Sequence, residues 1–345
     1  MLFRSGLTNL AEFAFFSCKS LRQIAIPSGI TAIAFAAFAA CRSLSSVVLP
    51  EGMTRVGREA FANCTMLASI NIPAGLTSLG PGAFSGCESL TGLSLPSSLK
   101  SIGPNAFSNC SSLDGVILPD GIDRIEEGLF QGCRSLTAIV VPEGVTRILP
   151  YAFYDCSRLA NVSLPNSLAT IAANAFYACS SLADIGGPPV AANAAVTGPQ
   201  PLQSPAFFAG QSAGRMAGLA VASNALPAGV TEIGASAFQL CRSLPIITIP
   251  ASVTSIAAGA FRSCTSLGRI EVESGNRNFC SVDGVLLDRG KTTLLQWPSG
   301  AGGTATIPAG VTTIGDYAFE NSSVTAVSIP SDRKSTRLNS SHANI

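Results

Sequence analysis

The chain has 345 residues, 47% of them hydrophobic and only 12% charged, and its formal net charge is +1. Because charged residues are about half as frequent as in typical soluble domains, the surface must consist mainly of Ser, Thr, Ala, Asn and Gly. The repeated part holds no basic or acidic block, so we expect no nucleic acid partner. No apolar run approaches the roughly 18 residues that span a bilayer, so we expect no direct membrane insertion.

The first copy of a repeated unit is incomplete on its N-terminal side. Leu7–Phe15 occupy the places that Ile30–Phe38 occupy in the next copy. The opening residues lack the charged and apolar regions of a secretory signal. We therefore expect that the native N-terminus is missing, which leaves the compartment undetermined.

Cysteine and phenylalanine recur at a fixed interval. Cysteines stand 23 residues apart from Cys18 to Cys179 and again at Cys241 and Cys264, and a phenylalanine precedes each by three residues. Together with Phe319, which has no cysteine after it, the phenylalanines mark eleven copies of one unit. A period of this length predicts a solenoid in which neighbouring units bury each other's apolar sides.

Aligned on cysteine, the unit reads L-x-x-I-x-I-P-x-G-V-T-x-I-G-x-x-A-F-x-x-C-x-S. The I-x-I alternation, as in Ile24 and Ile26, predicts a strand with one buried face. Proline ends that strand because it cannot donate to a sheet, and the Gly or Ser two residues later makes a turn. V-T-x-I-G predicts a second short strand, and A-F-x-x-C predicts a single helical turn or tight bend with Phe inside.

The phenylalanines and cysteines are expected to form two columns in the interior. The structural residues named from this pattern are Phe38, Cys41, Phe61, Cys64, Phe84, Cys87, Phe107, Cys110, Phe130 and Cys133. Zinc motifs bring cysteines two to four residues apart, which these are not, and stacked in-register thiols match disulfide geometry poorly. We favour reduced, buried apolar fillers over disulfides or zinc. Cys280, outside the column, is either a reactive thiol or, more simply, a hairpin core residue.

Residues 186–224 interrupt the repeat with a Pro-, Gly- and Ala-rich stretch that has no strand or helix signals. Removing these 39 residues restores the 23-residue spacing between Cys179 and Cys241. We expect a disordered insert, either a loop extruded from one coil or unspliced sequence, with the solenoid continuing beyond it.

Residues 278–300 hold two apolar runs separated by the polar turn DRGKTT, which predicts a β-hairpin between two coils. The only tryptophan, Trp297, lies in the second run. It is either a partner-binding anchor or, as we favour, an aromatic side chain that closes the hairpin over the neighbouring coil.

After residue 330 the repeat stops. The stretch DRKSTRLNSSH resembles translated sequencing adapter, so we interpret 331–345 as an artefactual, disordered tail. The only histidine, His342, lies in it. Nucleophilic catalysis and metal binding commonly need histidine, and the Glu126–Glu127 pair sits in a variable linker typical of a solvated turn. We therefore expect no catalytic, cofactor or metal site and no enzymatic activity.

The unit resembles the BspA-like type of leucine-rich repeat found in bacterial and protist surface proteins, which has the same I-P-x-x-V-T-x-I-G-x-x-A-F-x-x-C core. The resemblance covers about residues 3–185 and 225–330, and the F-x-S-x-D-G-V-L pattern within 278–300 is also shared. It implies a curved, right-handed β-rich solenoid over 1–185, continued over 225–330. It also implies recognition or adhesion at a cell surface or in a secreted form.

Any partner would contact the outward positions of the first strand. The candidate residues are Arg22, Gln23, Ser46, Asn71, Asp114, Asn161 and, outside the strand, Trp297. Tyr151, Tyr154 and Tyr177 on the opposite turn are a weaker candidate. Our leading hypothesis is a non-enzymatic scaffold that binds an unidentified protein. The alternative is a scaffold or regulatory segment of a larger intracellular protein whose catalytic domain is missing.

Overall fold

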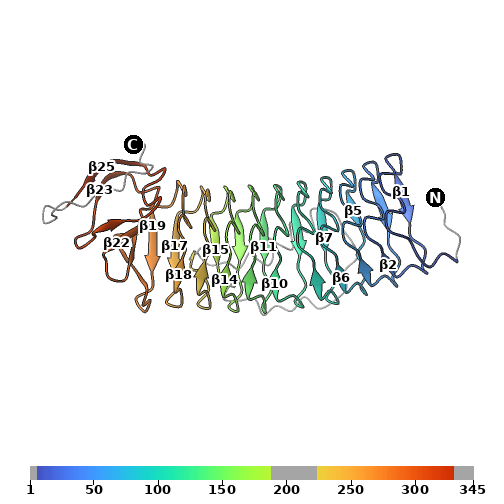
Figure 1. The fold of residues 1–345 in the computed structure, drawn as a ribbon, viewed down its shortest axis with the longest axis horizontal. Coiled ribbons are helices and arrows are strands. Elements are labelled where there is room, and N and C mark those ends of the chain that lie inside the picture. Colours follow the sequence, from blue (N-terminus) through green and yellow to red (C-terminus); the bar gives the residue numbers. More distant parts are fainter. Residues whose placement is uncertain (1–5, 188–223, 330–345) are drawn as a thin grey trace.

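The computed structural model describes residues 6–187 and 224–329, which form an elongated stack of about twelve coils. The first and last described coils lie at opposite ends of the stack (Figure 1). Each coil passes through one strand, a turn at proline, a second shorter strand and a tight turn segment before it enters the next coil. The predicted β-rich solenoid of roughly 23-residue coils is therefore confirmed.

The I-x-I strands form one side of the stack, which we call the front sheet. Neighbouring strands are parallel and in register, as where Ile24 lies opposite Val47. The front-sheet strands are β1 (Gln23–Ala25), β3 (Ser46–Val48), β5 (Ser69–Ile70), β7 (Gly92–Ser94), β9 (Gly115–Ile117), β11 (Ala138–Val140), β13 (Asn161–Ser163), β15 (Asp184–Gly186), β17 (Ile246–Ile249), β19 (Arg269–Val272), β23 (Gly303–Thr306) and β25 (Val324–Ser328). The central residue of each three-residue strand points inward because side chains alternate along a strand.

The V-T-x-I-G segments form a second side, the back sheet, with two-residue parallel strands. These are β2 (Ala32–Ile33), β4 (Arg55–Val56), β6 (Ser78–Leu79), β8 (Ser101–Ile102), β10 (Arg124–Ile125), β12 (Arg147–Ile148), β14 (Thr170–Ile171), β16 (Glu232–Ile233), β18 (Ser255–Ile256) and β24 (Thr313–Ile314). In Figure 1 they form the row below the front-sheet strands. In the inner coils the second residue of most of these strands is fully buried.

The A-F-x-x-C segments form the third side, which we call the turn ladder. Of the two predicted alternatives, the tight bend is present and the helical turn is absent. No helix occurs among the described residues. Ala36 and Ala40 have φ of 49° and 60°, and left-handed residues on both sides of Phe38 prevent a right-handed helix. Successive backbone amides of the segment donate alternately to the next coil and to a carbonyl of their own coil. Phe38 N–H donates to Ala60 O of the next coil at 2.9 Å, whereas Ala39 N–H donates back to Ala36 O at 3.1 Å.

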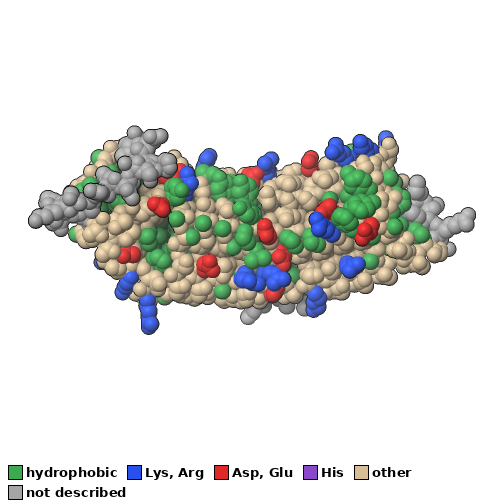
Figure 2. Space-filling view, in the orientation of Figure 1, with side chains coloured by type: hydrophobic (Ala, Val, Ile, Leu, Met, Phe, Trp, Pro, Cys, Tyr) green, Lys and Arg blue, Asp and Glu red, His purple; other side chains and the backbone are tan. Residues whose placement is uncertain are grey.

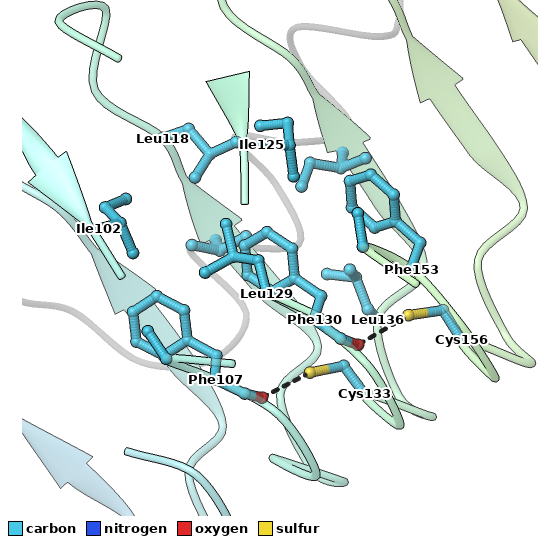
Figure 3. Close-up of a cluster of buried hydrophobic side chains, with 14 of the residues drawn as sticks. Ile102, Phe107, Leu118, Ile125, Leu129, Phe130, Cys133, Leu136, Phe153 and Cys156 are labelled. Carbon is cyan, nitrogen blue, oxygen red and sulfur yellow. Dashed lines mark hydrogen bonds between the residues drawn. The ribbon is translucent and has the colours of Figure 1, made fainter. Parts of the chain in front are cut away.

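The phenylalanines stack face to face along the axis. Ring centroids of consecutive members from Phe15 to Phe261 lie between 5.1 and 5.9 Å apart. Figure 3 shows Phe107, Phe130 and Phe153 in this column, with Ile125 and Leu136 packed around them. Each ring is buried by the coil on either side, so the core exists only in the stack.

The stack continues across the first interruption. Ile171 of β14 pairs directly with Ile233 of β16, and the rings of Phe176 and Phe238 stack at 5.5 Å. Asn224 is buried, and its side-chain oxygen accepts a hydrogen bond from Ile185 N–H at 3.0 Å. The insert expected at 186–224 lies almost wholly outside the described residues, but its two flanks belong to one coil.

The second interruption contains more structure than a single hairpin. The expected pair is present as β21 (Val285–Asp288) and β22 (Thr293–Gln296), which are antiparallel. An additional strand, β20 (Phe279–Val282), pairs with β21 in the antiparallel sense. Strand β22 also pairs in parallel with β24, so it serves as the back-sheet strand of an additional coil. The repeat pattern missed this coil because Trp297 replaces its phenylalanine.

Candidate binding face

The outward side of the front sheet is a regular surface that runs along the stack. In β1 and β3 the central residue is buried and both neighbours are exposed. Figure 2 shows a few small groups of charged side chains on the visible side of the molecule, with largely uncharged surface between them. The front face is therefore a ribbon of small side chains arranged in columns. Each coil contributes one residue to each column.

Arg22, Gln23 and Ser46 lie together at the N-terminal end of this face. Gln23 and Ser46 are exposed and occupy directly opposed positions in β1 and β3. Arg22 is exposed immediately before β1, and its carbonyl accepts hydrogen bonds from Ser45 N at 2.8 Å and Ser45 Oγ at 3.0 Å. The backbone thus fixes this corner while the three side chains face outward.

The side-chain amide of Asn71 makes hydrogen bonds within the fold. Its Oδ1 accepts a hydrogen bond from Leu49 N and its Nδ2 donates to Leu49 O, both at 3.2 Å. The amide extends the sheet where β5 ends and so replaces backbone pairing. Asn71 therefore offers less hydrogen-bonding capacity to a partner than its place in the repeat suggests.

Asp114 and Asn161 lie further along the face and are half-buried. Loss of water contact raises the pKa of the Asp114 carboxyl above its ordinary value. Its Oδ1 is buried and has no hydrogen-bond partner in the described part of the chain. Asn161 sits in β13 between Ala138 and Asp184. These two residues do not adjoin the Arg22 corner, so the candidates spread along the ribbon instead of forming one cluster.

Trp297 lies in the core and not on the front face. It is 8% exposed, stacks on Phe319 at 5.3 Å, and its Nε1–H donates to Ala301 O at 3.0 Å. Its backbone N–H donates to Ala318 O at 2.8 Å, as Phe38 does to Ala60. Trp297 therefore takes the phenylalanine position of the additional coil, and its burial leaves little surface for a partner anchor.

The column cysteines are more than fillers. Each inner thiol donates to the carbonyl of the phenylalanine one coil earlier, as from Cys133 Sγ to Phe107 O at 3.1 Å and from Cys156 Sγ to Phe130 O at 3.1 Å (Figure 3). Burial raises the pKa of Cys110 and Cys264 to about 12. These thiols are accordingly protonated and poorly nucleophilic at neutral pH. The sequence does not reveal this hydrogen bond, because its acceptor lies 26 residues away and is placed only by stacking.

Cys280 occupies a hairpin position. It lies opposite Leu287 in the β20–β21 pair, and its Sγ donates to Asp288 O at 3.2 Å. Burial raises the pKa of this thiol, although the charges of Lys291 and Arg289 act in the opposite direction. The structure therefore does not show an activated nucleophile at Cys280.

A group of three tyrosines lies on the turn ladder. The rings of Tyr154 and Tyr177 stack at 4.8 Å, and Tyr151 packs against Tyr154 at 5.8 Å. Arg134 and Asp155 form an ion pair beside them at 2.7 Å. The signal for this group is the 23-residue spacing of Tyr154 and Tyr177, which places both at one position of consecutive coils.

The described residues contain no group of three or more His, Cys, Asp or Glu side chains placed to hold a metal ion. No helix in this part of the chain has the length and apolarity needed to cross a membrane.

A stack of short parallel strands with internal phenylalanine and cysteine columns defines a repeat scaffold. A family model described as "BspA type Leucine rich repeat region (6 copies)" matches residues 1–114, 77–190, 218–281 and 303–341. The chain belongs to this BspA-type leucine-rich repeat family.

Solved structures of bacterial leucine-rich repeat proteins are similar to the chain. One from T. pallidum is 38% identical, with 43% of this chain and 69% of that chain covered and a TM-score of 0.42. One from Bacteroides ovatus is 24% identical, with 90% and 79% covered and a TM-score of 0.47. A leucine-rich cell surface protein from Faecalibacterium prausnitzii is 28% identical, with 50% and 62% covered and a TM-score of 0.36. No curated protein sequence matches the chain.

Proposed function

We propose that the chain is a non-enzymatic scaffold at a cell surface that binds a protein partner through its front sheet. The observation that carries this proposal is the register of the sheet, in which Gln23, Ser46 and Ser69 occupy one outward column at consecutive coils. Such columns present the same kind of side chain repeatedly over an extended surface, which suits a partner that is itself long or flat.

Small side chains shape the energetics of such contact. Ser and Ala lose little rotamer freedom on binding, but they also supply no large anchor, so affinity must come from a wide area. Val48 is 54% exposed in the same sheet and adds apolar surface to the ribbon. A partner that covers several coils at once would use both features.

A matched pair of substitutions tests the front sheet. Ser69→Arg changes an exposed residue of β5, at the position where β19 has Arg269. Ser101→Arg makes the same change on the exposed back sheet, where the equivalent residue of β10 is Arg124. With the protein coated on beads, Ser69→Arg should reduce attachment to intact cells at least several-fold, while Ser101→Arg should not. Equal attachment by both variants would show that the front sheet is not the binding surface.

Location is tested separately. Antibodies against the folded chain should label intact source cells, and brief protease treatment of those cells should abolish the signal. Labelling only after permeabilisation would instead support an intracellular scaffold within a larger protein.

A further inference from the structure

The additional coil is shorter than an inner coil at the start of the turn ladder. Phe38 follows Ile33 by five residues, whereas Trp297 follows Leu294, at the same places in the stack, by three. The additional coil therefore lacks the segment that would lie beside Gly259 in the turn ladder. A cavity of about 140 Å³ lies at this point, between the coil before and the coil after.

The cavity has apolar walls and a polar opening. Phe261 and Leu286 line it and are both 1% exposed, so they form its inner end. Ile256 and Leu295 are half-buried along its sides, and the exposed Asp316 lies at its opening. A cavity of this volume has room for about four or five non-hydrogen atoms, because a water molecule takes about 30 Å³.

Backbone groups on two sides of the cavity lack their usual partners. In an inner coil the amides of Ala36 and Phe38 donate to carbonyls of the next coil, both at 2.9 Å. The equivalent amides of Gly259 and Phe261 donate to no acceptor in the described part of the chain. The carbonyl of Asp316 takes the place of the acceptor for Ala36, and no described residue donates to it. The cavity thus offers two donors from one coil and an acceptor from another.

Gln296 adds a buried polar side chain to the cavity. It is 4% exposed and lines the wall. Its Nε2 donates to Trp297 O at 3.0 Å and to Ala318 O at 3.1 Å, and no described residue donates to its Oε1. Polar groups held away from water without a partner cost free energy, so a ligand that pairs with them gains affinity.

We propose that this cavity binds the acetamido group of an N-acetylated amino sugar. A trans secondary amide has its carbonyl and its N–H on opposite sides, as the absent ladder segment would have. The ligand carbonyl accepts from the amides of Gly259 and Phe261, and the ligand N–H donates to Asp316 O or Gln296 Oε1. The methyl group packs against Phe261 and Leu286. An acetamido group has four non-hydrogen atoms, which matches the volume.

The two ends of the cavity favour an amino sugar over a peptide. Phe261 and Leu286 close the inner end, so a chain cannot continue beyond the methyl group. At the opening, the Asp316 carboxylate can accept a hydrogen bond from a hydroxyl next to the acetamido group. An amino sugar carries such a hydroxyl, whereas a peptide carries a further amide there. The cavity adjoins the turn ladder, so this inference goes beyond partner binding by the front sheet and does not depend on it.

Two-dimensional amide NMR of the isotope-labelled full chain tests the proposal. Titration with N-acetylglucosamine should move the amide protons of Gly259 and Phe261 downfield, because both gain an acceptor. Glucose, which lacks the acetamido group, should leave them unchanged. N-acetylalanine methylamide is the peptide probe and should bind more weakly than the sugar. Amides that do not respond to N-acetylglucosamine, an equal response to glucose, or tighter binding of the peptide probe would each overturn the proposal.

Two variants separate the parts of the site. Ile256→Phe should fill the cavity and abolish the response to N-acetylglucosamine, with the melting temperature as the check on folding. Asp316→Asn should weaken the sugar several-fold, because a carboxylate is the stronger acceptor, yet bind N-methylacetamide as the wild type does. Asp283→Asn, at an exposed carboxylate that does not line the cavity, is the matched control and should bind both ligands unchanged.

The variants also give outcomes that contradict the site. Full binding by a folded Ile256→Phe variant, or equal loss of the sugar in Asp316→Asn and Asp283→Asn, would place the ligand elsewhere. If Ile256→Phe does not fold, the comparison of the two aspartate variants decides.

Discussion

The column cysteines determine how this core responds to pH. Each inner thiol is fully buried and donates to a carbonyl one coil earlier, as Cys110 Sγ does to Phe84 O at 3.2 Å. The repeat pattern is sufficient to predict their burial, because a small apolar residue every 23 positions must share one place in the stack. It cannot predict the hydrogen bond, which depends on how far one coil is displaced from the next.

Alkaline pH should destabilise the fold through these thiols. Burial raises the pKa of Cys64 and Cys110 from 9.0 to about 12, so unfolded thiols ionise while folded ones remain protonated. Their contribution to stability is therefore complete below pH 9 and is lost between pH 9 and about 12. Each thiol costs about 1.4 kcal/mol per pH unit in this range.

Urea denaturation at several alkaline pH values measures this slope. Cys110→Ser keeps a donor for Phe84 O and should show a slope smaller by one proton than the wild type. Identical slopes for the two proteins would show that Cys110 does not titrate on unfolding.

The elements differ in how far their sequence specifies them. Both strands are predictable because the I-x-I pattern and proline are strong signals. The turn ladder is not, because A-F-x-x-C is short enough to suit a helical turn. Its left-handed residues include Ala36, Glu59 and Tyr151, with φ of 49°, 52° and 59°. Gly82, Asn105 and Gly128 occupy the same position in other coils, and residues of these types favour a left-handed backbone. The sequence does not indicate the left-handed backbone in coils that have Ala, Glu or Tyr at this position.

Close contact between coils should make the glycine that follows β6 sensitive to substitution. A Cβ built on Gly80 would lie 2.4 Å from Arg58 N and 2.6 Å from Gly57 C, and neither backbone atom can move alone. Gly80→Ala should therefore lower the free energy of unfolding by about 1–3 kcal/mol. Gly52→Ala is the matched control, since its Cβ would meet only Ser28 O at 3.9 Å. Equal denaturation midpoints for the two variants would contradict this account of coil spacing.

At the scale of the whole molecule, the repeat predicts a continuous stack but undercounts its coils. Trp297 hides one coil because it replaces phenylalanine and shortens the turn that follows β22. The candidate binding face is less predictable than the stack. Period and polarity select the front sheet, yet only the structure shows that Asn71 is bonded to Leu49 and that Trp297 is buried. Only the structure shows that Tyr154 and Tyr177 form one aromatic group, because stacking of the coils places their rings 4.8 Å apart.

Excision of residues 186–224 should leave one cooperative solenoid. The deletion joins Ile185 to Ala225, which already pairs with Thr248 in the parallel sense, and it restores the regular spacing of the buried residues. Stability should rise by about 1–3 kcal/mol, because a long chain segment no longer has to be closed on folding. Thermal unfolding followed by circular dichroism should show a single transition at a higher temperature.

A deletion of equal length shifted by two residues, 184–222, is the matched control. It brings Asn224 into the core position of Ile185, which is 0% exposed in the intact chain. An unpaired amide there should cost about 2–5 kcal/mol, from the lost apolar packing and the unsatisfied polar group. If the 186–224 deletion instead melted in two separate transitions, or at the temperature of the shifted control, the coils on either side of the insert would not share a continuous core.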